Sequence, residues 1–123
     1  MINERVALNL DDMKVAAGDA ISFIDGISEQ NFLASPQLQK ACSMCLVIIG
    51  EAAARIEQTS PEFIASHRDW PWKEIRGLRN IVVHDYASLE MRRVWLTINA
   101  ALPDLLARIE ALGELDPRLW PRD

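Results

Sequence analysis

The sequence predicts an all-α fold, a small antiparallel bundle of about five helices with a kinked last helix, in a single domain over residues 1–123. Apolar residues recur at helical spacing along most of the chain. Two helix-start signals, Ser35-Pro36 and Ser60-Pro61, each combine an N-cap residue with a proline at the first helical position. Strand-like alternation is confined to the short run Ile81-Val82-Val83, which helical pattern surrounds.

The first two helices are expected to be long. The first begins at Asn3 or Asn9 and ends near Gly26, because a glycine can adopt a left-handed cap. The second begins with Ser35 as N-cap and Pro36 at its first position. Their apolar stripes comprise Leu10, Met13, Ala17, Ala20, Ile21, Ile24 and Ile27 in the first helix, and Leu38, Ala41, Cys42, Cys45, Ile48, Ile49, Ala52 and Ile56 in the second.

Three more helices follow in the second half of the chain. A short one starts after Ser60-Pro61, a fourth runs from about Trp72 towards His84, and the last begins near Ser88. Pro103 falls inside the last pattern and should kink that helix, because proline removes a backbone hydrogen bond and clashes with the preceding turn. The last apolar stripe comprises Met91, Val94, Trp95, Ile98, Leu102, Leu105, Ile109 and Leu112.

Composition limits the class of protein. Half of the residues are apolar and 25% are charged, as in a globular domain. The longest apolar run, Cys42–Gly50, stops at Glu51, so no membrane span is expected, and no secretory signal opens the chain, so we expect a cytoplasmic protein. The apolar stripes are wide for a chain of this size, which favours a symmetric dimer.

Charge is unevenly distributed along the chain. The net charge is −5, which argues against a general polyanion binder. The window from Ser66 to Trp95 is nevertheless +2, and the rest of the chain is −7. Such a cationic window either binds a phosphate-bearing ligand or forms a solvated helix face. Within it, Lys73 and Arg76 are candidate phosphate-binding residues.

Two other groups of residues have both a chemical and a structural interpretation. Cys42 and Cys45 have the spacing of a redox pair, but they lie inside a predicted helix, and no second pair or nearby histidine completes a zinc site. We interpret them as two small core residues and expect no metal and no cofactor. Trp70 and Trp72 could stack on bases, although such residues more often pack into a bundle.

The segment from Gly77 to Tyr86 contains the strongest candidates for chemistry. Arg79 stays cationic and can bind phosphate oxygens, whereas His84 can exchange a proton near neutral pH. Five residues on a regular helix rotate these two side chains about 140° apart. Either the helix ends at about His84, or the two residues converge across a dimer. Taken alone, the pair could also be an exposed polar face, with Arg76, Asn80 and His84 in one stripe and Gly77 allowing close backbone approach.

At this segment the chain resembles the HepT-type toxins of the HEPN superfamily of helical ribonucleases. The motif is arginine, four residues, histidine, any residue and tyrosine, which here reads Arg79, Asn80-Ile81-Val82-Val83, His84, Asp85 and Tyr86. The resemblance extends from about Asp11 to Leu112. It also includes the segments Ile49-Gly50-Glu51-Ala52, Pro71-Trp72, Gly77-Leu78-Arg79-Asn80, Val94-Trp95 and Leu102-Pro103-Asp104-Leu105.

The resemblance implies a homodimer that cleaves RNA without a metal ion, with Arg79 and His84 of both subunits in one cleft. Its catalytic set would be Arg79, His84 and Asn80. It further implies a type VII-like toxin–antitoxin pair, in which a minimal nucleotidyltransferase antitoxin transfers AMP to Tyr86, the only tyrosine in the chain. An attached AMP would add bulk and negative charge close to His84. Asp85 is interpreted as a local cap or the partner of an arginine.

Two other functions remain open at this stage. The chain could be a non-catalytic helical dimer that docks on the nucleotidyltransferase and binds nucleotide or phosphate. It could also be an interaction module whose arginines are solvated surface. A neighbouring gene for a small nucleotidyltransferase would disfavour the interaction module. Growth arrest that is abolished by His84→Ala would separate the ribonuclease from the non-catalytic partner.

Overall fold

The computed structural model describes residues 2–88 and 90–115, and among these residues the regular structure is entirely helical, which confirms the all-α prediction. Four helices are long: α1 (Glu4–Phe23), α3 (Pro36–Thr59), α6 (Leu78–Ser88) and α7 (Met91–Leu115). Three are short: α2 (Glu29–Leu33), α4 (Pro61–Ser66) and α5 (Trp72–Arg76).

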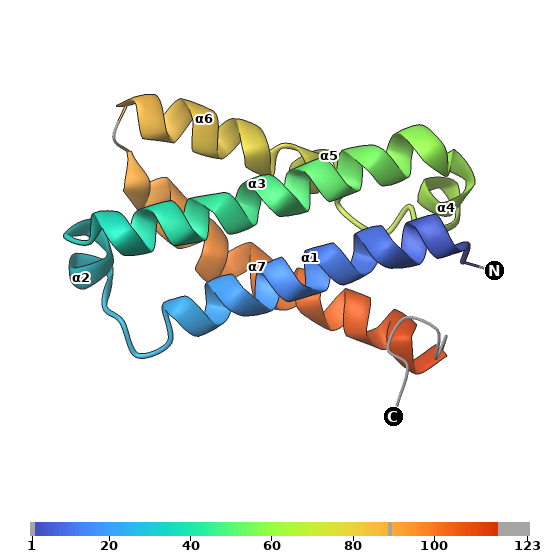
Figure 1. The fold of residues 1–123 in the computed structure, drawn as a ribbon, viewed down its shortest axis with the longest axis horizontal. Coiled ribbons are helices and arrows are strands. Elements are labelled where there is room, and N and C mark those ends of the chain that lie inside the picture. The colour runs from blue at the N-terminus through green and yellow to red at the C-terminus, as the bar shows by residue number, and fades with distance from the viewer. Residues whose placement is uncertain (1, 89, 116–123) are drawn as a thin grey trace.

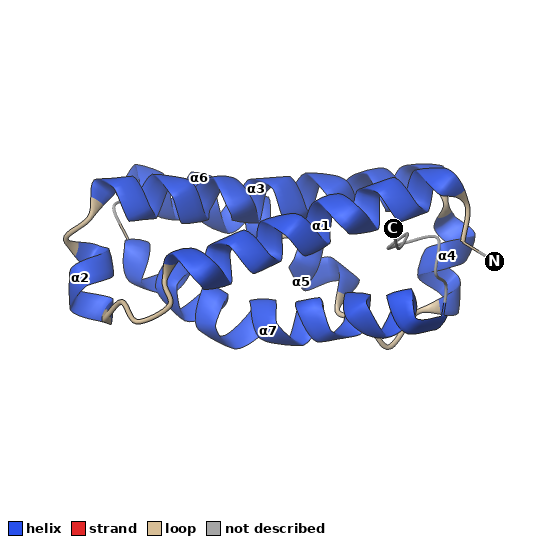
Figure 2. Cartoon of the chain, turned by 60° about the horizontal axis from the view of Figure 1, so that its bottom comes forward, coloured by secondary structure: helices blue, strands red, loops and turns tan. Residues whose placement is uncertain are grey.

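Three of the four long helices form a layer, and the fourth packs on one face of it. In Figure 1, α6, α3 and α1 lie side by side, with α3 in the middle and antiparallel to both neighbours. Figure 2 shows α7 on one side of this layer, where it packs against α1 and α6. The core lies between the layer and α7, and each long helix turns its buried stripe towards it. No helix of the described residues covers the outer face of the layer (Figure 2).

Two of the three helix-start residues read from the sequence, Asn3 and Ser35, form side-chain caps as expected. The side chain of Asn3 accepts a hydrogen bond from the Val6 amide at 2.8 Å, and Ser35 accepts one from the Leu38 amide at 3.2 Å. Gly26 lies just beyond α1 with φ 74°, in the left-handed region that favours glycine. Ser60 precedes α4, but its hydroxyl accepts a hydrogen bond from the Asn3 amide group instead of capping the helix.

The fourth predicted helix is in fact two helices. It divides at Gly77 into α5 and α6, so Arg76 does not belong to the helix that carries Asn80 and His84, and the proposed single stripe is wrong. The chain is tight at this point, because a Cβ at Gly77 would lie 3.3 Å from the Lys73 carbonyl oxygen. Helix α6 then continues to Ser88, beyond the end expected from the sequence.

Helix α2 was absent from the sequence-based prediction. Its cap is a serine, Ser28, whose hydroxyl accepts a hydrogen bond from the Asn31 amide at 3.1 Å. A helix of five residues is too short to show helical periodicity. It nevertheless buries Phe32 completely, against Trp95 of α7 at a ring-centroid distance of 5.2 Å.

Helix α7 closes the core over most of its length. Its buried residues follow the predicted apolar stripe: Met91, Val94, Ile98, Leu102, Leu105 and Ile109. Pro103 lies on the exposed side, and the helix continues past it to Leu115. Among the described residues, every helix falls short of the length or apolar character that a membrane crossing requires.

Candidate active site

Helix α6 exposes most of the polar residues of the arginine–histidine–tyrosine motif. Its buried positions are Leu78, Val82 and Asp85, which recur at helical spacing and face the core. The side chains in between point away from this stripe. The exposed ones are Arg79, Asn80 and His84, and Tyr86 is half-buried.

Arg79 is held by a carboxylate from the neighbouring helix. Its Nε atom lies 2.9 Å from Oε1 of Glu51 on α3, and both side chains are about half exposed. An ion pair this exposed contributes little to folding stability. Its clearer consequence is geometric, because it fixes the direction of a guanidinium group whose two terminal nitrogens are separate donors.

A glycine on α3 allows this contact. A Cβ atom on Gly50 would lie 3.0 Å from the Arg79 amide nitrogen and 3.2 Å from the Arg76 carbonyl oxygen. The backbones of α3 and α6 therefore meet where only a hydrogen atom fits. The close approach between helices, expected at Gly77, is instead at Gly50.

His84 does not meet Arg79 within one chain. Helix α6 runs on to Ser88, so the alternative in which the helix ends at His84 is wrong. The two side chains are rotated about 140° apart on a regular helix. Arg79 lies towards α3, and His84 is exposed, with no hydrogen bond to its ring from the described residues. Two interpretations remain, convergence across two copies and an exposed polar face.

Asp85, between His84 and Tyr86, is completely buried. Neither carboxylate oxygen has a hydrogen-bond partner among the described residues, and Nη1 of Arg93 on α7 lies 3.7 Å from Oδ1. The interpretation of Asp85 as the partner of an arginine is therefore confirmed. Its complete burial was not foreseen, since a charged residue is rarely buried unless it is paired.

The two candidate phosphate ligands on α5 differ in their surroundings. Arg76 is bound by Glu57 of α3 through two contacts of 3.0 Å, one from Nε and one from Nη1. Lys73 is exposed in the same short helix. Two glutamates of α3 thus pair with the arginines of α5 and α6, which reduces the positive potential that the sequence window suggested.

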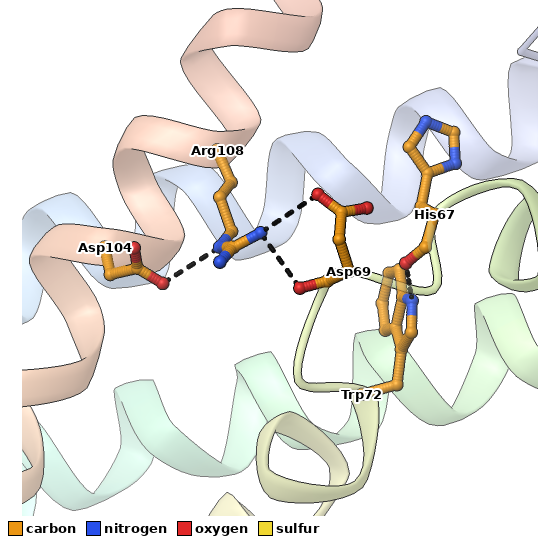
Figure 3. A network of polar contacts seen from close by, with 5 residues as sticks. All are labelled: His67, Asp69, Trp72, Asp104 and Arg108. Carbon is orange, nitrogen blue, oxygen red and sulfur yellow. Dashed lines mark hydrogen bonds and ion pairs between the residues drawn. The ribbon is translucent and has the colours of Figure 1, made fainter.

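The tryptophans form part of the core, as the structural interpretation expected. Trp70 and Trp72 are buried and stack on each other at a ring-centroid distance of 5.1 Å. Figure 3 shows how the turn that carries them is fastened. Trp72 Nε1 donates to the His67 carbonyl oxygen, and Arg108 of α7 donates to Asp104 and to Asp69. The hydrogen bond with Asp104 raises the pKa of Arg108.

The cysteines also have structural surroundings. Cys42 and Cys45 are buried free thiols, and burial raises the pKa of each to about 11. Because the thiolate is the reactive form, neither side chain is suited to redox or nucleophilic chemistry near neutral pH. In the part of the chain that the structure describes, no three His, Cys, Asp or Glu side chains are grouped as metal ligands would be.

Comparison with known proteins identifies the family. The sequence profile described as "Ribonuclease HepT-like" matches residues 13–112, which is most of the chain. The chain belongs to the HepT-like ribonuclease family. This assignment agrees with the exposed motif on α6.

The aligned residues cover most of the length of two relatives. A protein of Caldanaerobacter subterraneus subsp. tengcongensis, named as a candidate RNase, is 35% identical over 92 residues, which are 75% of this chain and 80% of the relative. A protein of Thermococcus cleftensis, named as a probable ribonuclease HepT, is 30% identical over 103 residues, 84% of this chain and 91% of the relative. No solved structure matches the chain.

The contact at Gly50 can be tested by adding one methyl group. Gly50→Ala should lower the free energy of unfolding by about 1–2 kcal/mol, because overpacking outweighs the higher helix propensity of alanine. Gly18→Ala is the matched control, since nothing lies within 4 Å of a Cβ there. That change should be neutral or stabilise the protein by up to about 1 kcal/mol. Urea unfolding of both variants checks the prediction, and equal effects would contradict it.

Proposed function

We propose that the protein is a metal-independent endoribonuclease toxin whose active site forms between two copies of the chain. The observation that carries the proposal is the placement of Arg79 and His84. Both are exposed on one helix of a HepT-like ribonuclease, but they point in different directions. In a symmetric pair of copies, Arg79 of one chain can meet His84 of the other, and the arrangement is repeated by symmetry.

The open face of the α6–α3–α1 layer supports association with a second copy. Val83 lies one turn after Arg79 on α6 and is 60% exposed. Met44 and Ile48, one turn apart on α3, are also exposed, as is Val15 on α1. Exposed apolar side chains on one face of a layer are typical of an interaction surface. A second copy placed there would cover them and bring the two motifs together.

The side chains of the motif suit cleavage of RNA by its own 2′-hydroxyl. His84 takes the proton of the 2′-hydroxyl or protonates the departing 5′-oxygen. The 2′-oxygen forms the new bond to phosphorus, and the bond from phosphorus to the 5′-oxygen breaks. Arg79 stabilises the charge on the phosphoryl oxygens, and Asn80 orients the phosphate or the imidazole. This reaction requires RNA, because DNA lacks the 2′-hydroxyl.

Tyr86 is the proposed site of silencing by a minimal nucleotidyltransferase antitoxin. It is half-buried and lies two residues after His84, on the helix that carries the motif. Transfer of AMP from ATP to its hydroxyl forms a phosphodiester and releases pyrophosphate. The added phosphate is negative and would repel the RNA phosphates at the same surface. The family and the position of Tyr86 close to His84 on α6 support this proposal.

The first test is RNA cleavage in EDTA by protein that was produced without a nucleotidyltransferase. Wild type should cleave, and His84→Ala should lower the rate by about 10²–10⁴-fold because it removes the proton-transfer group. Arg79→Ala should cause a loss of similar order. Both residues are exposed, so circular dichroism should show unchanged helix content.

Two control variants make this test specific. Arg92→Ala removes an arginine that, like Arg79, is exposed and bound to a glutamate through Nε. His67→Gln removes the other histidine of the chain. Both should keep wild-type cleavage. If unmodified wild type binds RNA but cuts nothing, the chain is instead a non-catalytic dimer that binds phosphate.

The second test separates the roles of Tyr86. Tyr86→Phe lacks the hydroxyl that would accept AMP but keeps the ring, so it should cleave RNA like wild type. It should also continue to cleave after incubation with the nucleotidyltransferase and ATP, whereas wild type should lose activity. Intact-mass measurement of both proteins reports the added AMP. An inactive Tyr86→Phe would instead give the phenol a direct part in catalysis.

A further inference from the structure

The burial of Asp85 is not explained by the packing of α6. Asp85 follows Leu78 and Val82 in the buried stripe. An apolar side chain would pack there without the desolvation cost of a charged group. The Asp85 carboxylate is 0% exposed and accepts no hydrogen bond from the described residues. A buried charge with one distant partner is unfavourable compared with an apolar residue of similar size. A role outside the core would account for it.

The partner of this carboxylate reaches the surface next to the motif. Arg93 lies in the first turn of α7, and its side chain is 56% exposed although Asp85 is fully buried. Helix α3 covers the flank of α6 that carries Arg79. We therefore place the exposed guanidinium of Arg93 on the other flank, to which His84 belongs. Asp85 directly follows His84 in the chain, so the carboxylate that holds Arg93 and the histidine are in the same turn of α6.

Arg93 also differs from Arg76, Arg79 and Arg92 in its hydrogen bonds. Arg76, Arg79 and Arg92 each bring a nitrogen within 3.2 Å of a carboxylate oxygen. The contact of Arg93 is 3.7 Å long, beyond hydrogen-bond distance. Its guanidinium is therefore positioned by charge, and its N–H donors form no hydrogen bond with the described residues and remain available. A planar group with free donors at the surface suits a phosphate with two oxygens in reach.

We propose that Arg93 is a further RNA-binding residue, which contacts a phosphate next to the one that is cleaved, and that Asp85 is its positioning residue. This inference rests on the proposed ribonuclease function and extends the site from α6 to α7. It also explains the buried carboxylate, because Asp85 fixes an arginine that would otherwise sample many rotamers before it meets RNA.

The test measures RNA binding without cleavage. Single-stranded RNA of mixed sequence is titrated with the His84→Ala protein by fluorescence anisotropy between 50 and 300 mM NaCl. A second change in this protein, Arg93→Gln, should weaken RNA binding on the order of tenfold at low salt. It should also make the dependence of log K on log salt shallower by about 0.7, the value for one phosphate contact on a single strand. Arg93→Lys should restore the salt dependence, because it keeps the charge.

Two further variants separate positioning from structure. Arg92→Gln, the neighbouring exposed arginine bound to Glu29, should leave affinity and salt dependence unchanged. Asp85→Asn should weaken binding less than Arg93→Gln, and the double variant should bind no more weakly than Arg93→Gln alone. If Arg93→Gln lowers only the melting temperature and leaves RNA affinity and its salt dependence unchanged, the pair is structural and the proposal is overturned.

Cleavage by the corresponding variants with His84 intact distinguishes this inference from the proposed function. Arg93→Gln should raise KM with little change in kcat, as expected for a contact made equally in the ground and transition states. If wild type cleaves RNA and Arg93→Gln has the same KM and kcat, the role of Arg93 is overturned and the proposed ribonuclease function is not. Loss of RNA affinity in Arg93→Gln, with no cleavage by wild type, would support Arg93 as an RNA ligand and overturn the proposed function.

Discussion

The close approach of α3 and α6 at Gly50 is the constraint on which the site depends. Because no side chain separates the two backbones there, Glu51 of α3 reaches Arg79 of α6, and the rotation of α6 is fixed. Once Leu78, Val82 and Asp85 face the core, His84 has to point outward, away from Arg79. The glycine therefore determines where the arginine is held. The helical rotation of about 140° between the two positions explains why a single copy does not bring the histidine to it.

Much of the fold could be predicted from the sequence because its signals are local. The caps at Asn3 and Ser35 and the apolar stripe of α7 depend on residues within a few turns of each other. The break at Gly77 was missed because periodicity continues across it, and α2 was missed because one turn shows no period. Arg79 and His84 are candidates on their chemistry alone, and the resemblance adds the roles of Asn80 and Tyr86. Glu51 and Arg93, the partners of Arg79 and Asp85, lie on other helices, as does Glu57, the partner of Arg76. Contacts between helices leave no periodic signal in the sequence.

The distribution of charge suggests how an acidic protein could bind RNA. The cationic window contains several arginines, but carboxylates of α2, α3 and α6 pair with Arg76, Arg79, Arg92 and Arg93. Such pairing lowers the long-range attraction for polyanions and leaves short-range, directed donors. We therefore expect recognition through a few positioned guanidinium groups instead of a broad basic surface. An AMP group on Tyr86 would then need to block only a small area.

The proposed site requires Arg79 of one copy and His84 of the other. Mixing Arg79→Ala and His84→Ala proteins after mild unfolding and refolding, and then measuring RNA cleavage in EDTA, tests this requirement. Random pairing makes about half of the dimers mixed, and each mixed dimer holds one complete site, so about a quarter of the wild-type rate should return. If the refolded mixture forms mixed dimers but stays as inactive as its components, the two residues act within one chain, and the account is contradicted.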